Sequence, residues 1–118
     1  MKVKTNKLTG VALDHAVAKA EGRTVYQSKS GRFMTANYGE FNHRHGTPWF
    51  TPSTSWGWGG PIIEREKMRI AHNFDEHIWE AGWDCHVSGW GDTPLIAAMR
   101  CYVASKLGDE VEVSNELA

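Results

Sequence analysis

The residues best suited to recognising a partner are tryptophans interleaved with glycines near the middle of the chain, in Trp56-Gly57-Trp58-Gly59-Gly60. Tryptophan provides a large, rigid contact surface at low entropic cost and is enriched where proteins bind partners. We therefore predict Trp56, Trp58, Gly59 and Gly60 as binding residues. The alternative is that these rings are buried, which is the common fate of large aromatic side chains.

A second candidate constellation combines Glu64 with Arg100. Arg100 borders the apolar face of a predicted helix that carries little charge, so its guanidinium needs a carboxylate or carbonyl partner. We expect a structural ion pair between these two side chains. The alternative is that Arg100 receives an anion in a pocket.

Histidine and cysteine raise the question of a metal site. Zinc sites use paired ligands at short characteristic spacings, and the fragments His43-Arg44-His45, Asp75-Glu76-His77 and Cys85-His86 match none of them. The sequence also lacks a nucleophile elbow, a catalytic-cysteine signature and a phosphate-binding loop. We therefore predict no catalytic residue, no metal ligand and no cofactor.

Two segments predict the main helices, because apolar residues recur in them at helical spacing. The first runs from Thr9 to Glu21, and Gly22 follows it as a helix-ending residue. The second is helix 94–107, with Thr93 as its N-cap and Pro94 in its first turn. Small residues line the back of this second helix, which predicts cover on both sides, by a sheet and by another helix or a second subunit. Self-association through helix 94–107 is therefore one of two open alternatives, the other being cover by a helix of the same chain.

The other segments predict a small antiparallel sheet of about four strands. The predicted strand segments are residues 24–26, 33–38, 67–71, 77–87 and 111–113. The first two form a hairpin that turns at residues 28–31, and a turn or short helix precedes the third. Residues 39–61, rich in Gly, Pro and Trp, predict a long loop. Together these elements predict an α+β fold with two main helices on the sheet, in a single domain spanning residues 1–118.

Composition narrows the functional class. The chain is 41% hydrophobic and 23% charged, which is typical of a globular protein. Because no apolar run is long enough for a membrane span and no secretory signal is visible, we expect a cytoplasmic protein with no membrane partner and with Cys85 and Cys101 reduced. Residues 1–48 carry eight Lys/Arg against three Asp/Glu, and residues 49–118 carry five against eleven. This asymmetry fits attraction between the two halves or an edge that binds polyanions.

Four runs of sequence resemble one known family. They are Lys7-Leu8-Thr9-Gly10-Val11-Ala12-Leu13-Asp14, Pro52-Ser53-Thr54-Ser55-Trp56, Gly59-Gly60-Pro61-Ile62-Ile63-Glu64 and Gly91-Asp92-Thr93-Pro94-Leu95-Ile96-Ala97-Ala98-Met99-Arg100. With these runs the chain is similar to the NinX-type family of lambdoid phages and prophages, small proteins of unknown function. It departs from that family at His15, where a tryptophan is usual, and at Ser55, where an aspartate is usual. The resemblance implies a phage accessory protein expressed in the cytoplasm of the bacterial host, and it implies no activity.

Three functions stay open from the sequence. The first is a non-catalytic binding or adaptor protein that engages a host or phage macromolecule through the Trp/Gly segment. The second is single-stranded nucleic-acid binding, with Trp56 and Trp58 as stacking platforms beside the basic half of the chain. The third is a small enzyme, which would need Glu64, Arg100 and a histidine in one pocket.

Overall fold

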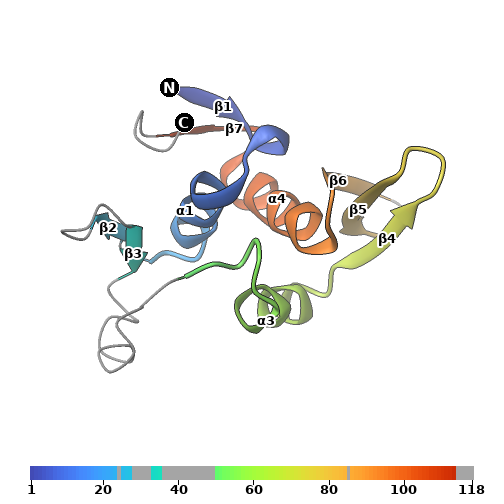
Figure 1. Ribbon diagram of the computed structural model, residues 1–118, viewed down its shortest axis with the longest axis horizontal. Coiled ribbons are helices and arrows are strands. Elements are labelled where there is room, and N and C mark those ends of the chain that lie inside the picture. The colour runs from blue at the N-terminus through green and yellow to red at the C-terminus, as the bar shows by residue number, and fades with distance from the viewer. Residues whose placement is uncertain (24, 28–32, 36–49, 85, 114–118) are drawn as a thin grey trace.

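The computed structural model describes residues 1–23, 25–27, 33–35, 50–84 and 86–113, and for residues 25–27 and 33–35 it describes the backbone alone. The predicted turn at residues 28–31, the predicted loop from 39 to 49, the histidines of that loop and Cys85 lie outside the described residues. The helices, labelled as in Figure 1, are η1 (Thr5–Lys7), α1 (Gly10–Ala20), α3 (Trp56–Glu66) and α4 (Pro94–Leu107). The strands are β1 (Lys2–Lys4), β2 (Val25–Gln27), β3 (Phe33–Thr35), β4 (Arg69–Asn73), β5 (Ile78–Trp83), β6 (His86–Gly91) and β7 (Glu110–Glu112).

The described strands pair in antiparallel fashion, which together with the helices confirms the α+β class. They are divided among a three-stranded sheet with the order β4-β5-β6 and two pairs, β2-β3 and β1-β7. In the β1-β7 pair, Val3 lies opposite Val111, so the beginning of the chain lies beside its last described strand (Figure 1). The predicted hairpin is confirmed in its pairing, with Tyr26 opposite Met34.

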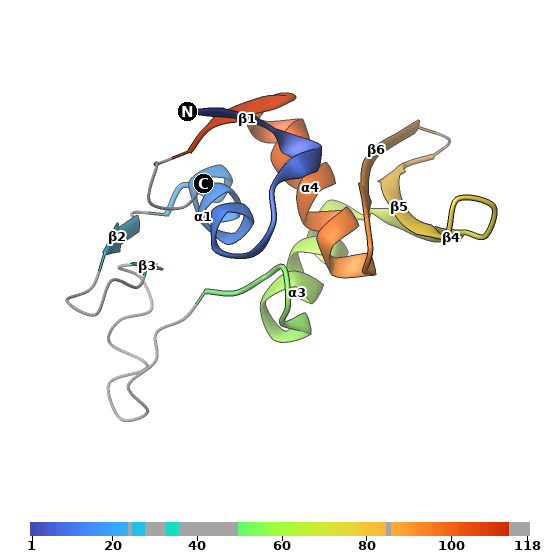
Figure 2. The same cartoon turned by 45° about the horizontal axis from the view of Figure 1, so that its top comes forward.

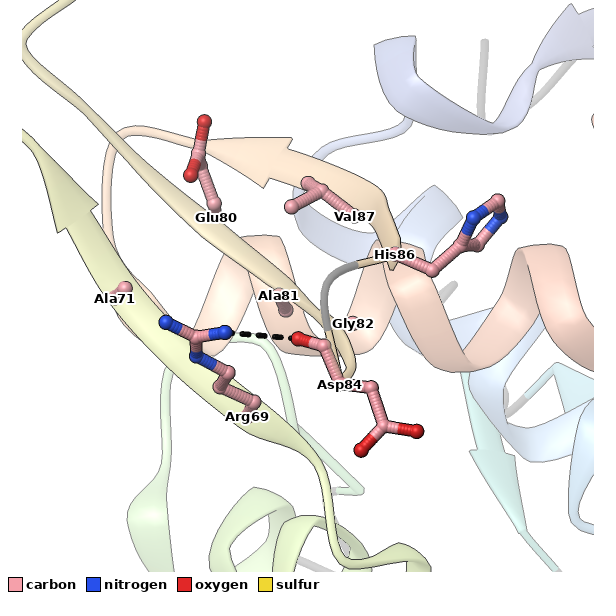
Figure 3. A pocket seen from close by; sticks show the side chains of 8 residues that line it. All are labelled: Arg69, Ala71, Glu80, Ala81, Gly82, Asp84, His86 and Val87. Atoms are coloured by element: carbon pink, nitrogen blue, oxygen red, sulfur yellow. Dashed lines mark hydrogen bonds between the residues drawn. The ribbon is translucent and has the colours of Figure 1, made fainter.

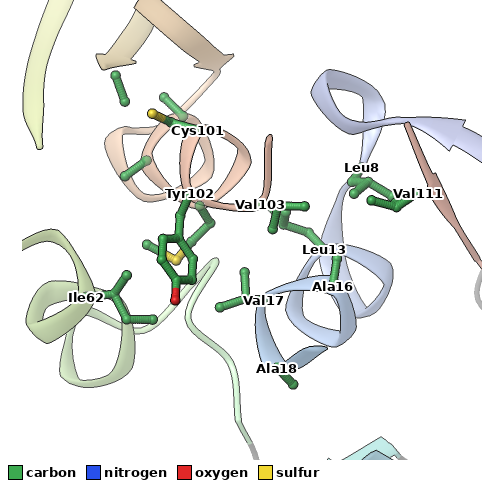
Figure 4. Close-up of a cluster of buried hydrophobic side chains, with 14 of the residues drawn as sticks. Leu8, Leu13, Ala16, Val17, Ala18, Ile62, Cys101, Tyr102, Val103 and Val111 are labelled. Carbon is green, nitrogen blue, oxygen red and sulfur yellow. The ribbon is translucent and has the colours of Figure 1, made fainter. Parts of the chain in front are cut away.

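Helix α4 lies at the centre of the molecule, between the three-stranded sheet and the helices α1 and α3 (Figures 1 and 2). It begins as predicted, because the Thr93 side chain accepts a hydrogen bond from the Ile96 backbone N–H at 3.1 Å. Tyr102 and Val103 point towards α1 and α3, whereas Cys101 points towards the sheet (Figure 4). Both sides of α4 are therefore covered within the chain. Self-association through this helix stays a prediction, but an uncovered side of α4 no longer supports it.

The sheet lies close to α4 because β6 carries glycines where it meets the helix. A Cβ atom on Gly89 would lie 2.2 Å from the Ala97 carbonyl oxygen and 2.5 Å from the Cys101 backbone nitrogen. A Cβ atom on Gly91 would lie 2.6 Å from Ile96 Cγ2. The two glycines and the small residues on the back of α4 thus allow backbone-to-backbone packing.

Two of the local predictions are wrong. The single strand predicted for residues 77–87 is a hairpin of β5 and β6, because the chain reverses at Asp84, whose φ is 51°. Gly82 lies beside this reversal at a bulge, where a Cβ atom would lie 1.9 Å from the His86 carbonyl oxygen. In the predicted loop, residues 56–61 are helical and form the first half of α3.

The hydrophobic core lies between the three helices α1, α3 and α4 (Figure 4). Leu13 and Val17 of α1, Ile62 of α3, and Met99 and Val103 of α4 are all buried in it. These side chains fix the position of α3 relative to the other two helices. Within the described residues, none of the helices combines the length and the apolar character that a membrane span requires.

Candidate functional site

Helix α3 forms although it contains three glycines and Pro61. Proline lacks a backbone N–H, and it disfavours the helical conformation of the residue before it, chiefly through that residue's Cβ. The preceding residue is Gly60, which has no Cβ, so the helix passes through Pro61. Gly59 is buried, and a Cβ atom there would lie 2.6 Å from both Leu95 Cδ2 and the Pro52 carbonyl oxygen. Gly59, one of the residues that predicted a loop, is therefore a residue that this helix needs to pack on α4.

The segment that leads into α3 is tied to α1 by a buried carboxyl group. Asp14 Oδ1 accepts a hydrogen bond from the Ser53 backbone N–H at 2.8 Å. Burial raises the pKa of Asp14 from 3.8 to about 6, and hydrogen bonding from Ser53 opposes this rise only in part. Asp14 is one of the few buried ionisable groups in the described residues.

The other end of α3 is held by a polar network that joins three helices. The Arg65 guanidinium donates to both carboxylate oxygens of Glu21, at 2.6 and 3.2 Å, and the Tyr102 hydroxyl donates to the same carboxylate. Burial raises the pKa of Tyr102, and the Glu21 carboxylate raises it further. Burial also acts to raise the pKa of Glu21, but hydrogen bonds from Arg65 and Tyr102 and the neighbouring positive charges hold it below its usual range. The Trp83 indole N–H donates to the Glu66 carbonyl oxygen at 2.7 Å and completes this anchor.

Anchored at both ends, α3 presents one side to solvent. That side consists of Trp56, Gly57, Gly60, Pro61 and Glu64, here called the α3 open face. The Trp56 side chain is 56% exposed, and its ring lies next to Gly60, where a Cβ atom would be 3.9 Å from Trp56 Cε3. Among the described residues, a Cβ atom on Gly57 would contact only Ser55 Oγ, at 3.5 Å. The face is therefore flat at its centre, with an indole at one end and a carboxylate at the other.

The structure divides the predicted binding residues into three groups. Trp56, Gly60 and Glu64 share the α3 open face. Trp58 is half-buried against the core, where its ring meets Phe50 edge to face with the ring centroids 5.3 Å apart, and Gly59 is buried.

Arg100 forms the third group, and it does not pair with Glu64. Its Nε donates to the Leu8 carbonyl oxygen at 2.9 Å, and its Nη1 donates to the Trp90 carbonyl oxygen at 2.7 Å. Burial lowers the pKa of Arg100, and the charge of Asp92 opposes this. No ion pair joins Arg100 to Glu64 in the described residues, so the predicted ion pair is wrong, and carbonyl groups satisfy the guanidinium instead.

A hollow of about 240 Å³ lies on the three-stranded sheet (Figure 3). Its polar lining groups do not converge on a common point. The Arg69 guanidinium donates to the Asp84 carbonyl oxygen at 2.9 Å, whereas the Asp84 carboxylate points away from it (Figure 3). Glu80 accepts a hydrogen bond from the Asn73 side chain at 3.0 Å. This arrangement offers no acid–base pair, and neither Glu64 nor Arg100 lines the hollow.

The described His, Cys, Asp and Glu side chains are the candidates for a metal site. Among the described residues, no three His, Cys, Asp or Glu side chains gather in a group that could hold a metal ion. Cys101 is a free, buried thiol whose sulfur lies 3.2 Å from the Ser88 hydroxyl oxygen. Burial raises the pKa of this thiol, so Cys101 has the environment of an inert structural cysteine.

Two features were missed by reasoning from the sequence. Asp14 lies off the apolar stripe of the first predicted helix and gives no local sign that it is buried. Phe74 lies in the turn between β4 and β5, and the signal for that turn was present in the run Asn73-Phe74-Asp75-Glu76, because Asn and Asp favour turns.

Comparison with known proteins places the chain in a family. A search of curated proteins gives no significant match. The sequence pattern of the family described as Bacteriophage P22, NinX matches residues 4–106, which include η1, α1, α3, the whole three-stranded sheet and all of α4 except its last residue. The chain therefore belongs to the bacteriophage P22 NinX family of phage accessory proteins.

Proposed function

We propose that this NinX-family protein is a non-catalytic binding or adaptor protein that engages a host or phage macromolecule through the α3 open face in the host cytoplasm. The observation that carries the proposal is the indole of Trp56, which is 56% exposed on a helix held at both ends. Tryptophan is one of the side chains most enriched among the energetic anchors of interfaces.

The anchoring of α3 supports this function. Asp14 fixes the segment before the helix through Ser53, and Glu21 fixes its last turn through Arg65. A surface that is already ordered loses less conformational freedom when a partner binds, so more of the contact energy appears as affinity. The α3 open face is thus pre-organised for binding.

Gly57 adds a second line of support. Glycine in a helix is less stable than alanine by about 0.5–1 kcal/mol. Gly57 has no positive φ, and among the described residues only Ser55 Oγ, at 3.5 Å, lies near its Cβ position. The described part of the fold therefore does not require glycine there, whereas a partner that approaches the helix backbone beside Trp56 would.

The first experiment compares the protein with its Trp56→Ala variant. Each is used as bait in lysate of phage-infected bacterial cells, and the retained protein is purified and its affinity measured by calorimetry. We expect Trp56→Ala to weaken that affinity at least about tenfold, the effect of losing one interface anchor. Val11→Ala is the matched control, because Val11 is also an exposed apolar residue, 54% exposed on α1. Equal affinity of the protein and the Trp56→Ala variant would refute the proposal.

The Gly57→Ala variant separates binding from stability. The added methyl group fills space on the α3 open face, so we expect weaker binding. At the same time the helix gains propensity, so the free energy of unfolding should stay equal or rise by up to about 1 kcal/mol. A variant that binds less while folding at least as well cannot owe its loss of binding to unfolding.

The same exposed indole supports a second candidate, stacking on the bases of a single-stranded nucleic acid. Stacking on an aromatic side chain is worth about 1–3 kcal/mol per base, and the phosphate contacts make such binding sensitive to salt. The test titrates a single-stranded oligonucleotide into the protein at 50 and 200 mM salt while tryptophan fluorescence is recorded. Absence of a salt-sensitive affinity, or an affinity that Trp56→Ala leaves unchanged, removes this candidate.

A further inference from the structure

The turn between β4 and β5 leaves the side chain of Phe74 largely exposed to solvent. Phe74 is 78% exposed, which exceeds the value for every other large apolar side chain in the described residues. The hairpin of β4 and β5 projects away from α4 and from α3 in both views of the molecule (Figures 1 and 2). Phe74 is thus available to a partner without any change in the fold.

The position of this ring is fixed by its neighbours. Asn73 Oδ1 accepts hydrogen bonds from the backbone N–H groups of Asp75 and Glu76, both at 3.0 Å. The His72 ring meets the Phe74 ring edge to face, with the centroids 4.6 Å apart, and meets Trp79 in the same way at 5.0 Å. The turn is therefore an ordered platform, and an ordered exposed ring loses little entropy when it is buried by a partner.

The charges around Phe74 decide which class of partner fits. From Ile70 to Met99 the sequence has no lysine or arginine. The carboxylates in the same stretch are Asp75, Glu76, Glu80, Asp84 and Asp92. The two that follow Phe74 directly, Asp75 and Glu76, are exposed. They would repel the phosphates of a nucleic acid or of an anionic membrane and attract a basic protein surface.

We infer that the β4–β5 turn is a docking element that inserts Phe74 into an apolar pocket, rimmed by lysine or arginine, on a partner protein. The ring supplies the buried contact, and the carboxylates of Asp75 and Glu76 pair with the basic rim. This inference does not rest on the function proposed for the α3 open face, because the turn and α3 lie on different parts of the molecule (Figure 1).

The test begins with photo-crosslinking in phage-infected bacterial cells. The photoreactive residue p-benzoylphenylalanine replaces Phe74 in one protein and Val11 in the other, and adducts are compared after irradiation. We expect a protein adduct that forms from position 74 and not from position 11. The crosslinked protein is then purified, and its affinity for the unmodified chain and for substituted chains is measured by calorimetry.

Four measurements on that purified partner follow. We expect Phe74→Ala to weaken binding at least about tenfold, and Phe74→Trp to preserve it. The double change Asp75→Asn, Glu76→Gln should weaken binding and flatten its dependence on salt. Val11→Ala, at an exposed residue outside both proposed surfaces, should leave this affinity unchanged. Thermal unfolding of each variant is recorded beside the binding data.

The inference is overturned if position 74 yields no adduct beyond that of position 11, or if the adduct is nucleic acid or a second copy of this chain. It is also overturned if the purified partner binds the Phe74→Ala variant as tightly as the original chain. Should Phe74→Ala unfold, the Phe74→Trp and the Asp75→Asn, Glu76→Gln variants decide the outcome by the same comparison.

Discussion

Replacing Asp14 by asparagine should change how the stability of this protein depends on pH. In the folded protein Asp14 is buried and accepts the Ser53 backbone N–H through Oδ1 at 2.8 Å. The amide oxygen of an asparagine can accept the same hydrogen bond, so the segment that leads into α3 stays tied to α1. The substitution therefore removes the ability to become charged while preserving the contact.

The magnitude follows from the raised pKa. Below about pH 3 the carboxyl is protonated in the folded and the unfolded chain, so its titration contributes nothing. As the pH rises from about 3 to about 7, the unfolded chain releases this proton first, and the free energy of unfolding falls. With a pKa of 3.8 in the unfolded chain and about 6 in the folded protein, the loss amounts to about 3 kcal/mol in total and is complete above about pH 7.

The measurement is urea unfolding of the protein and of Asp14→Asn, followed by circular dichroism at pH 4, 5, 6 and 7. The difference in free energy of unfolding between the two chains should shift by about 2.4 kcal/mol in favour of the variant from pH 4 to pH 7. Taking this difference cancels the other groups that titrate in the same range, such as His15, whose pKa burial lowers and the charge of Lys19 lowers further. A carbon-13 titration of the Asp14 carboxyl should show a midpoint near 6.

Two results would refute the reasoning. One is a difference between the two chains that stays constant from pH 4 to pH 7, since burial would then place no penalty on the charged carboxylate. The other is a carboxyl midpoint near 4, the value of a solvated aspartate. Either result would mean that water or a positive charge reaches Asp14 in the folded protein.

Two further predictions test the packing around α3 and α4. Gly89→Ala should lower the free energy of unfolding by about 2–3 kcal/mol and the thermal midpoint by roughly 10 °C. The reason is that the new Cβ atom would lie 2.2 Å from the Ala97 carbonyl oxygen. A thermal midpoint within about 2 °C of the original would contradict this prediction. Glu21→Gln should destabilise by about 1 kcal/mol at pH 7, since the bond to the partly exposed Arg65 loses its charge. Because the pKa of Glu21 is lowered, the destabilisation by Glu21→Gln should shrink as the pH falls through that pKa, a trend opposite in sign to that of Asp14→Asn. A destabilisation that stays constant in urea unfolding between pH 3 and pH 7 would argue against the network.

The main helices could be predicted because their signals are local. The apolar spacing of residues 9–21, and Thr93 with Pro94 before residues 94–107, need no information from distant parts of the chain. Observed bounds of Gly10–Ala20 and Pro94–Leu107 agree with them closely. The need of Arg100 for a hydrogen-bond acceptor could be predicted, but the predicted partner Glu64 was wrong, because the partner depends on how η1 and β6 meet α4.

Helix α3 could not be predicted, because its glycines and its proline disfavour a helix locally and only tertiary contacts favour it. Gly59 is needed because Leu95 and the Pro52 carbonyl oxygen occupy the space of its Cβ atom. The reversal at Asp84 likewise depends on the pairing of β5 with β6. Local composition favoured a loop and a continuous strand at these two places, and tertiary packing overrode it.

By itself, then, the sequence determined the α+β class, the two main helices, the β2–β3 pairing and the family. Only the tertiary structure decided that Trp56 is exposed while Trp58 packs on the core, and that Asp14 is buried. The physical reason is that these outcomes depend on contacts between residues far apart in the chain. Asp14 meets Ser53, and Glu21 meets Arg65, across 39 and 44 positions of sequence, and these contacts set which side of α3 faces solvent.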